Sequence, residues 1–144
     1  MGSRVLAIAS GPDGVALVRR LGADEALDGH DQSVVEKARA FSPNGIDAAL
    51  VLASGADALL KLMKHGGRVA HPNGVEPPPR AHQGITVRAY DGYQGRDALL
   101  RLSNLVAKGS FHVEVSKEYS LAETPTALTD VTRHHIGKLA VRVH

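Results

Sequence analysis

The 144-residue sequence contains no cysteine and no tryptophan, and only 3% of its residues are aromatic. Without cysteine, the chain forms neither a disulfide nor a thiolate-ligated zinc site. Because aromatic side chains are few, the core has to be built from alanine, valine, leucine and isoleucine, as in parallel sheets covered by helices. Hydrophobic residues make up 43% of the chain, so we expect a domain that buries about 68–70% of its unfolded surface.

The chain also lacks a strong charge imbalance and a long apolar segment. Seventeen basic residues face fifteen acidic ones, and the longest basic run is two residues, so the basic patch of a nucleic-acid-binding protein is missing. The apolar run at residues 4–9 is too short for a signal-peptide core or a membrane span. The sequence therefore predicts a cytoplasmic protein with neither nucleic acid nor membrane as a partner.

Short apolar runs alternate with helical patterns along the chain. The runs at 4–9 and 46–52 have the length of buried parallel strands. Ser10-Gly11-Pro12-Asp13 opens a helix that Gly22 ends, and residues 33–36 (SVVE) form the pattern of a capping box. Further strands are expected at 25–27, 68–71, 85–89, 113–119 and 139–143, and helices at 34–41, 56–63, 97–108 and 123–131. The alternation predicts an α/β fold with a parallel sheet flanked by helices.

Four sequence segments carry a resemblance to a known family. They are RVLAIASGPDGVALVRRLGADEALD (4–28), GIDAALVLASG (45–55), LMKHGGRVAHPNG (62–74) and HHIGKLAVRV (134–143). In this order and spacing they resemble the cofactor domain of the medium-chain dehydrogenase/reductase superfamily, nearest its zinc-free quinone oxidoreductase and alcohol dehydrogenase-like branch. The resemblance implies a partial Rossmann-type NAD(P)-binding domain at 1–112. It also implies a C-terminal strand–helix–strand tail at 113–144, which in the family returns to the catalytic domain.

The chain departs from the family pattern at its start. Such a domain begins with a strand and a G-x-G-x-x-G turn whose backbone amides hold the pyrophosphate, and no such turn precedes Arg4. The catalytic domain is absent as well. We therefore expect a C-terminal part of an oxidoreductase that is inactive alone. The resemblance implies that full-length relatives reduce quinones, enones or carbonyls by hydride transfer.

The end of the first strand bears on cofactor preference. An acidic residue there would bind the ribose hydroxyls of NAD, but the strand ends in Ser10 and Gly11, with no acid until Asp13. A small polar end leaves room for a 2′-phosphate and predicts NADP(H) rather than NAD(H), with Arg19 or Arg20 as possible phosphate partners. The alternative is that Ser10 only caps the helix.

Two further turns follow predicted strands and complete the candidate cofactor site. Ligands bind outside the carboxyl ends of parallel strands, and by the resemblance these turns would line the ribose and the nicotinamide. Their residues are Ala53, Ser54, Gly55, Pro72, Asn73 and Gly74. The alternative is that both are ordinary turns. Tyr90 and Tyr93 follow the next strand, and we interpret them as half-buried packing residues rather than ligand contacts.

The remaining polar residues suggest no catalytic group or metal site. His134 and His135 are adjacent, which does not place both rings on one metal ion easily, so we expect no zinc in this chain. Asp24, Asp28 and Asp47 lie at element ends and are interpreted as caps or turn formers. Two alternatives to the oxidoreductase remain open, a methyltransferase-like Rossmann domain and a non-catalytic dimerising module. Because a missing central strand exposes sheet edges, we also expect a homo-oligomer, most simply a dimer.

Overall fold

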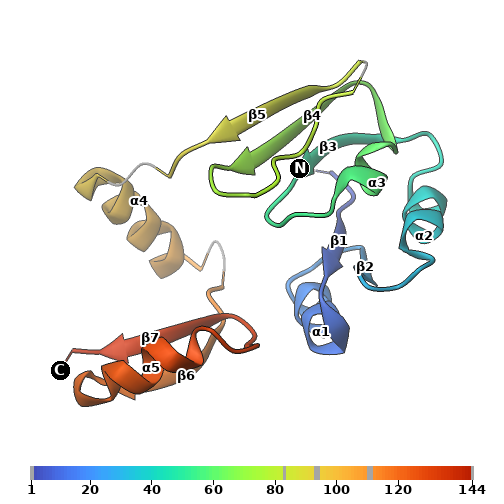
Figure 1. The fold of residues 1–144 in the computed structure, drawn as a ribbon. Coiled ribbons are helices and arrows are strands. Elements are labelled where there is room, and N and C mark those ends of the chain that lie inside the picture. The colour runs from blue at the N-terminus through green and yellow to red at the C-terminus, as the bar shows by residue number, and fades with distance from the viewer. Residues whose placement is uncertain (1, 83, 93–94, 110–111, 144) are drawn as a thin grey trace.

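The computed structural model describes residues 2–82, 84–92, 95–109 and 112–143. Tyr93, one of the two tyrosines considered above, lies outside these residues. The described chain forms three small parallel sheets with helices against them (Figure 1). The expected α/β class is therefore confirmed, including the C-terminal strand–helix–strand unit. None of the described helices is both long and apolar enough to cross a membrane.

The first sheet consists of two parallel strands, β1 (Leu6–Ala9) and β2 (Glu25–Asp28), in the register Leu6 to Glu25. Helix α1 (Gly11–Arg20) connects them. Its first turn contains Pro12 and Asp13, as expected, since proline fits the first turn and an acid suits the positive end of the helix dipole. Gly22 follows the helix with φ +99° and ends it. Helix α2 (Val34–Phe41) then leads away from β2.

The second sheet has the strand order β3-β4-β5, all parallel. Its strands are β3 (Ile46–Leu50), β4 (Met63–Pro72) and β5 (Thr86–Tyr90), with the one-turn helix α3 (Asp57–Leu60) between the first two. Buried apolar side chains from β4, from α3 and from the segments that follow β3 and β4 form the core: Val51, Leu60, Met63, Val69 and Val75. The core therefore lies directly behind the turns that follow β3 and β4.

The C-terminal part of the chain begins with helix α4 (Arg96–Ala107), none of whose residues is buried. It leads to the third sheet, formed by β6 (Val115–Ser120) and β7 (Lys138–Arg142). The short helix η1 (Leu121–Glu123) and helix α5 (Thr124–Asp130) connect these two strands. Figure 1 shows α5 lying along the β6–β7 pair, with α4 between this unit and the β3-β4-β5 sheet.

Burial is much lower than the sequence predicts. The chain exposes 10698 Å², whereas a compact protein of its mass exposes roughly 7,100 Å². Relative to an extended chain of roughly 22,000 Å², only about half of the surface is buried. The expected 68–70% is therefore wrong. The runs at 4–9 and 46–52 do form strands, but Ile8 and Leu50 expose 37% and 60% of their surface. Among the described residues, each of these strands pairs along one edge only.

Two local predictions also need correction. The helix expected at 56–63 is only one turn long, because Lys61 and Leu62 form a turn and β4 already begins at Met63. Ser33 does not cap α2, because its φ and ψ of −91° and 7° lie outside the extended region typical of an N-cap. Its hydroxyl donates to Asp31 Oδ1 at 2.7 Å. A capping box does exist at η1, where the amide and hydroxyl of Ser120 donate to Glu123 at 2.8 and 2.7 Å.

Candidate functional site

The turn after β1 is built around an unusual helix start. Ser10 precedes α1 with extended φ and ψ angles of −93° and 121°, yet its hydroxyl makes no capping hydrogen bond. Gly11 follows with φ +70°, a conformation that favours glycine. The interpretation that Ser10 acts only as a side-chain cap is therefore wrong. Its exposed hydroxyl lies at the carboxyl end of the strand instead.

Asp28, at the end of β2, holds this turn in place. Its Oδ1 accepts hydrogen bonds from the amide of Gly11 at 3.1 Å and from the amide of His30 at 3.0 Å. The amides of His30 and Gly11 lower the pKa of the Asp28 carboxyl, since they stabilise its charged form. The interpretation of Asp28 as a turn former is thus confirmed. Asp24 instead joins the starts of β1 and β2, because its Oδ2 accepts from the Val5 amide at 2.7 Å. Asp47 differs, because it is exposed and pairs with Lys64 Nζ at 2.7 Å.

The arginines suggested as phosphate partners lie away from this turn. Arg19 and Arg20 are in the last turn of α1, so at about 1.5 Å rise per residue they are roughly 12 Å along the helix axis from Gly11. Arg19 donates to the carbonyl of Ala26 at 3.4 Å, and Arg20 pairs with Glu114 at 3.3 Å. In this arrangement neither arginine lies where it would bind the same phosphate as Ser10.

The turns after β3 and β4 lie on adjacent strands of one sheet. Val51 donates to the carbonyl of Ala70 at 2.9 Å, which keeps the end of β3 beside β4. Ala53, Ser54 and Gly55 then follow as exposed residues. Gly55 has φ +87°, and a Cβ placed on it would meet nothing within 4 Å. The backbone is therefore open to close approach at this point.

The Pro72–Gly74 turn is fixed to the neighbouring strand by Asn73. The Asn73 amide donates to the carbonyl of Tyr90 at 3.0 Å, and its side-chain nitrogen donates to Asp91 Oδ1 at 2.6 Å. Gly74, with φ +97°, also has open space where a Cβ would lie. The sequence analysis did not include Asp91 among the site residues. Its position directly after a predicted strand was the one signal that could have indicated it. Tyr90 is 41% exposed, in line with the half-buried side chain that the sequence predicts.

The structure therefore places the predicted residues in two groups. The turns at 53–55 and 72–74 share the carboxyl edge of the β3-β4-β5 sheet, whereas Ser10 and Gly11 lie at the carboxyl end of β1 in a separate sheet. Within the described residues, no strand pairs with both β1 and β3. Their joint role in binding one ligand remains a prediction.

The described residues do not fit a zinc site. The sequence has no cysteine, and the described part of the chain contains no group of three His, Asp or Glu side chains that could hold a metal ion. His135 is engaged locally, with its Nδ1 2.8 Å from the Arg133 carbonyl oxygen. His71 is buried in β4 with its Nδ1 3.1 Å from the Pro72 carbonyl oxygen.

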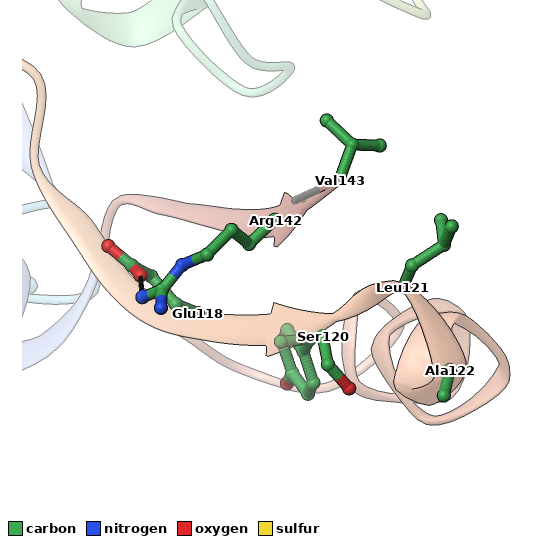
Figure 2. Close-up of a pocket in the computed structure, with 7 residues that line it drawn as sticks. Glu118, Ser120, Leu121, Ala122, Arg142 and Val143 are labelled. Atoms are coloured by element: carbon green, nitrogen blue, oxygen red, sulfur yellow. Dashed lines mark hydrogen bonds and ion pairs between the residues drawn. The ribbon is translucent and has the colours of Figure 1, made fainter.

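A shallow cavity of about 630 Å³ lies in the C-terminal unit (Figure 2). It is lined by Glu118, Tyr119, Ser120, Leu121, Ala122, Arg142 and Val143. Glu118 and Arg142 form an ion pair across β6 and β7. Because these two charges neutralise each other, this cavity offers less to a dinucleotide than the strand-end turns do.

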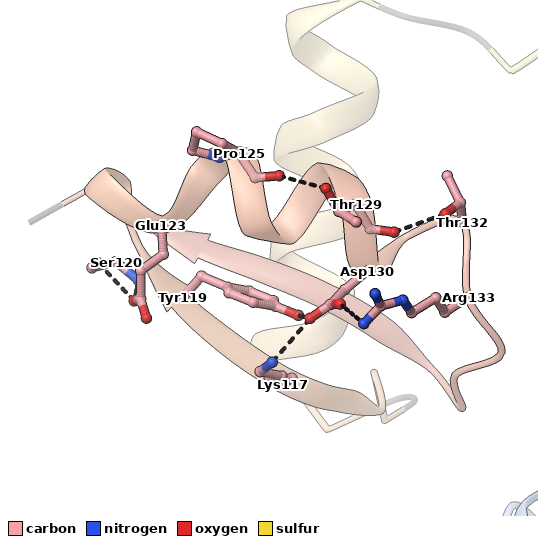
Figure 3. Close-up of polar contacts among 9 residues, drawn as sticks. All are labelled: Lys117, Tyr119, Ser120, Glu123, Pro125, Thr129, Asp130, Thr132 and Arg133. Carbon is pink, nitrogen blue, oxygen red and sulfur yellow. Dashed lines mark hydrogen bonds and ion pairs between the residues drawn. The ribbon is translucent and has the colours of Figure 1, made fainter.

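Polar contacts in the same unit attach α5 to β6 (Figure 3). Tyr119, buried to 3% exposure, donates its hydroxyl to Asp130 Oδ2 at 2.7 Å. Lys117 Nζ donates to the same oxygen at 3.0 Å, and Arg133 pairs with Oδ1 at 3.1 Å. Hydrogen bonds from Tyr119 and then Lys117 lower the pKa of the Asp130 carboxyl. Since all the partners are internal, we interpret the cluster as structural.

Comparison with known proteins identifies the family. Residues 21–141 match the family model described as zinc-binding dehydrogenase. None of the curated proteins compared with the chain matches it. Three similar solved structures are an NAD-dependent alcohol dehydrogenase, CurA from Vibrio vulnificus in complex with NADPH, and the quinone oxidoreductase from Thermus thermophilus, whose complex with NADPH is also described.

The similarity covers nearly all of this chain but about half of each relative. The alcohol dehydrogenase is 21% identical with a TM-score of 0.81, over 99% of this chain and 45% of that one. CurA is 20% identical with a TM-score of 0.70, over 99% and 50%. The quinone oxidoreductase is 30% identical with a TM-score of 0.72, over 99% and 50%. The family match and the shared parallel α/β fold confirm the resemblance seen in the sequence: the chain belongs to the zinc-binding dehydrogenase family of the medium-chain dehydrogenases/reductases.

Proposed function

We propose that this chain is the cofactor-binding part of an NADP(H)-dependent oxidoreductase that reduces quinones, enones or carbonyls. The observation that carries the proposal is the set of turns with a positive-φ glycine at the carboxyl ends of β1, β3 and β4. Dinucleotides bind at this edge of a parallel sheet. The NADPH complexes of CurA and the quinone oxidoreductase support the same cofactor class.

Each turn has a defined role in this proposal. The Ser10 hydroxyl hydrogen-bonds the phosphate on the adenine ribose, and the small side chain leaves space for it. Asp28 is assigned to holding the turn, because its Oδ1 accepts the amides of Gly11 and His30. The open space above Gly55 and Gly74 lets the backbone contact the ribose and nicotinamide. The bound cofactor supplies the hydride, and the chain binds and orients it.

The chain alone is proposed to bind cofactor weakly and to catalyse nothing. Its sequence contains no G-x-G-x-x-G turn, so the backbone amides that hold a pyrophosphate at a helix N-terminus are missing. It also spans about half the length of its structural relatives. When this chain is mixed with a quinone and NADPH, the absorbance at 340 nm should therefore fall no faster than in buffer without the chain. Turnover by the chain alone would contradict this part of the proposal.

Titration calorimetry with NADPH and NADH tests the cofactor preference. The Ser10→Asp variant puts a carboxylate where the 2′-phosphate is expected, so NADPH affinity should fall by about tenfold while NADH affinity holds or rises. Ser103→Asp is the matched control, because it adds the same charge on the exposed helix α4. Equal effects of the two variants on NADPH binding would contradict the site.

A non-catalytic dimerising module is the second candidate, and the surface of α4 favours it. Leu99, Leu102 and Leu105 expose 62%, 49% and 46% of their surface on this helix. Such a row of leucines favours helix packing against a second copy. Light scattering should then give a dimer mass that Leu102→Lys reduces to a monomer. A monomer of the unchanged chain at high concentration would contradict this candidate.

The remaining alternatives are less favoured. Family membership argues against a methyltransferase-like domain, and we expect no heat on titration with S-adenosylmethionine. The cytoplasmic location stays a prediction from the sequence, as does the domain division at residue 112.

A further inference from the structure

Two of the three asparagines in the chain stand in nearly identical sequences. They are Asn44 in PNGI (43–46) and Asn73 in PNGV (72–75). The backbone nitrogen that follows an asparagine can attack the side-chain amide, and a following glycine leaves this approach open because it has no Cβ. Both sequences are therefore candidates for deamidation. Because their neighbours along the chain are so similar, the fold decides which of the two reacts.

The nitrogen that follows Asn44 is already engaged. The Gly45 amide donates to the Ser42 carbonyl at 2.9 Å, and the Ser42 hydroxyl donates to the Gly45 carbonyl at 2.6 Å. A Cβ placed on Gly45 would lie 2.9 Å from Lys64 Cγ and 3.0 Å from the Leu62 carbonyl oxygen. The nucleophile is thus hydrogen-bonded and closely packed, so it neither loses its proton readily nor turns toward the Asn44 side chain.

The turn at Asn73 leaves the corresponding nitrogen open. Asn73 and Gly74 are both exposed, and a Cβ placed on Gly74 would meet nothing within 4 Å. Among the described residues, none accepts a hydrogen bond from the Gly74 amide. The Asn73 side-chain nitrogen donates to Asp91 Oδ1 at 2.6 Å, but this bond is exposed and competes with water. It holds the nitrogen that would leave, whereas the nitrogen that would attack stays free.

We propose that Asn73 is a site of spontaneous deamidation. The Gly74 nitrogen gives its proton to water and forms a bond to Asn73 Cγ, while the bond from Cγ to Nδ2 breaks. The departing ammonia takes up one proton, which balances the one released. The resulting succinimide ring then adds one water molecule. Opening at Cγ gives aspartate, and opening at the main-chain carbonyl gives isoaspartate. Nothing is oxidised or reduced, and solvent water is the co-reactant.

The product loosens the turn after β4, because the new carboxylate faces Asp91. The donor at Asn73 is replaced by an acceptor, so the hydrogen bond to Asp91 Oδ1 becomes a repulsion between two negative charges. Isoaspartate also lengthens the main chain between residues 73 and 74. The Val75 amide donates across this turn to the Pro72 carbonyl at 3.4 Å, and Val75 is buried in the core. The modification therefore acts on the core as well as on the exposed turn, and it does not depend on cofactor binding.

Incubation of the unchanged chain at mildly alkaline pH, followed by trypsin digestion and mass spectrometry, tests the proposal. Trypsin places the two asparagines in separate peptides, 40–61 and 69–80, and an unincubated sample gives the baseline. We expect Asn73 to be converted about fivefold faster than Asn44, the factor that one ordinary hydrogen bond on the Gly45 nitrogen is worth. Equal rates, or faster conversion of Asn44, would overturn the proposal.

The same measurement in urea separates the effect of the fold from that of the sequence. Once the chain is unfolded, both Pro-Asn-Gly sequences are equally accessible, so Asn44 and Asn73 should react at similar rates. A difference that persists in urea would show that the neighbouring residues, and not the open turn, determine the rate. That result would overturn the structural basis of the proposal.

Variants at residues 73 and 91 test the chemistry and its consequence. Asn73→Gln keeps the amide on a longer side chain that closes a five-membered ring no more, so conversion at 73 should stop while Asn44 reacts as before. Asp91→Ala frees the departing amide and should raise the Asn73 rate by about fivefold, and a lower rate would contradict the restraining contact. Asn73→Asp should speed amide exchange at Val75 relative to Asn73→Gln, with circular dichroism to confirm that both are folded. Equal exchange in the two variants would refute the loosening of the turn.

Discussion

Leu60 is the residue whose truncation best tests the described core. It closes α3 at 3% exposure and packs in the cluster with Val51, Met63, Val69 and Val75. Truncation to alanine removes three carbon groups from the apolar interior, worth about 2.4 kcal/mol at about 0.8 kcal/mol each. Large-to-small substitutions of this kind cost about 2–5 kcal/mol, depending on how far the site collapses.

We expect Leu60→Ala to lie at the lower end of that range, near 2.5 kcal/mol. Ala56 and Ile85 beside the cluster are only partly buried and can move into the space. For a chain of this size the loss corresponds to a fall in Tm of roughly 5–10 °C. Because the chain contains no tryptophan, far-ultraviolet circular dichroism in a urea titration is the suitable measurement.

Leu128→Ala is the matched control, since the same side chain is 66% exposed on α5. Its effect on the free energy of unfolding should stay within about 0.5 kcal/mol. A loss below about 1 kcal/mol for Leu60→Ala, or equal losses for both variants, would refute the described packing of α3. Because 53–55 lies between β3 and α3, Leu60→Ala should also speed amide exchange in that turn.

Three further predictions concern other parts of the chain. Gly137→Ala should destabilise the β6–β7 unit by about 3 kcal/mol, because its φ is +79° and a Cβ would lie 2.5 Å from the Glu114 carbonyl oxygen. Gly92→Ala is the control, since a Cβ there would meet nothing within 4 Å, and it should leave stability unchanged in the same urea titration. Asp28→Ala should speed amide exchange at Gly11, whereas Asp28→Asn, which keeps an acceptor, should speed it less; no difference between the two would count against the Asp28 contact. Asp130, whose pKa is lowered on folding, contributes stability above the pKa of the unfolded carboxyl and loses it as the pH falls through the lower, folded pKa. The stability difference between the unchanged chain and Asp130→Asn should therefore shrink as the pH falls from neutrality through the acidic range, and a difference that grows on acidification would contradict the sign.

The sequence predicted the elements well where local chemistry decides them. Ser10 to Asp13 with Gly22 gave both ends of α1, since proline, glycine and the helix dipole act within a single turn. It failed at Ser33, which has the spacing of a cap but a backbone conformation outside the extended region and a hydroxyl that donates to Asp31. It also failed where longer-range pairing competes with local preference. The end of the predicted helix at Met63 became strand because it pairs with Ile46 of β3.

For the candidate site, the sequence alone determined which turns follow the parallel strands, because apolar runs ending in glycine mark those positions locally. The contacts that fix these turns depended on tertiary structure: Asp28 reaches Gly11 seventeen residues away, and Asp91 reaches Asn73 across two strands. The separation of β1 from β3 was likewise decided in three dimensions. Strand order depends on which edges meet, and the residues of a short apolar run such as 4–9 or 46–52 do not specify which strand lies beside it.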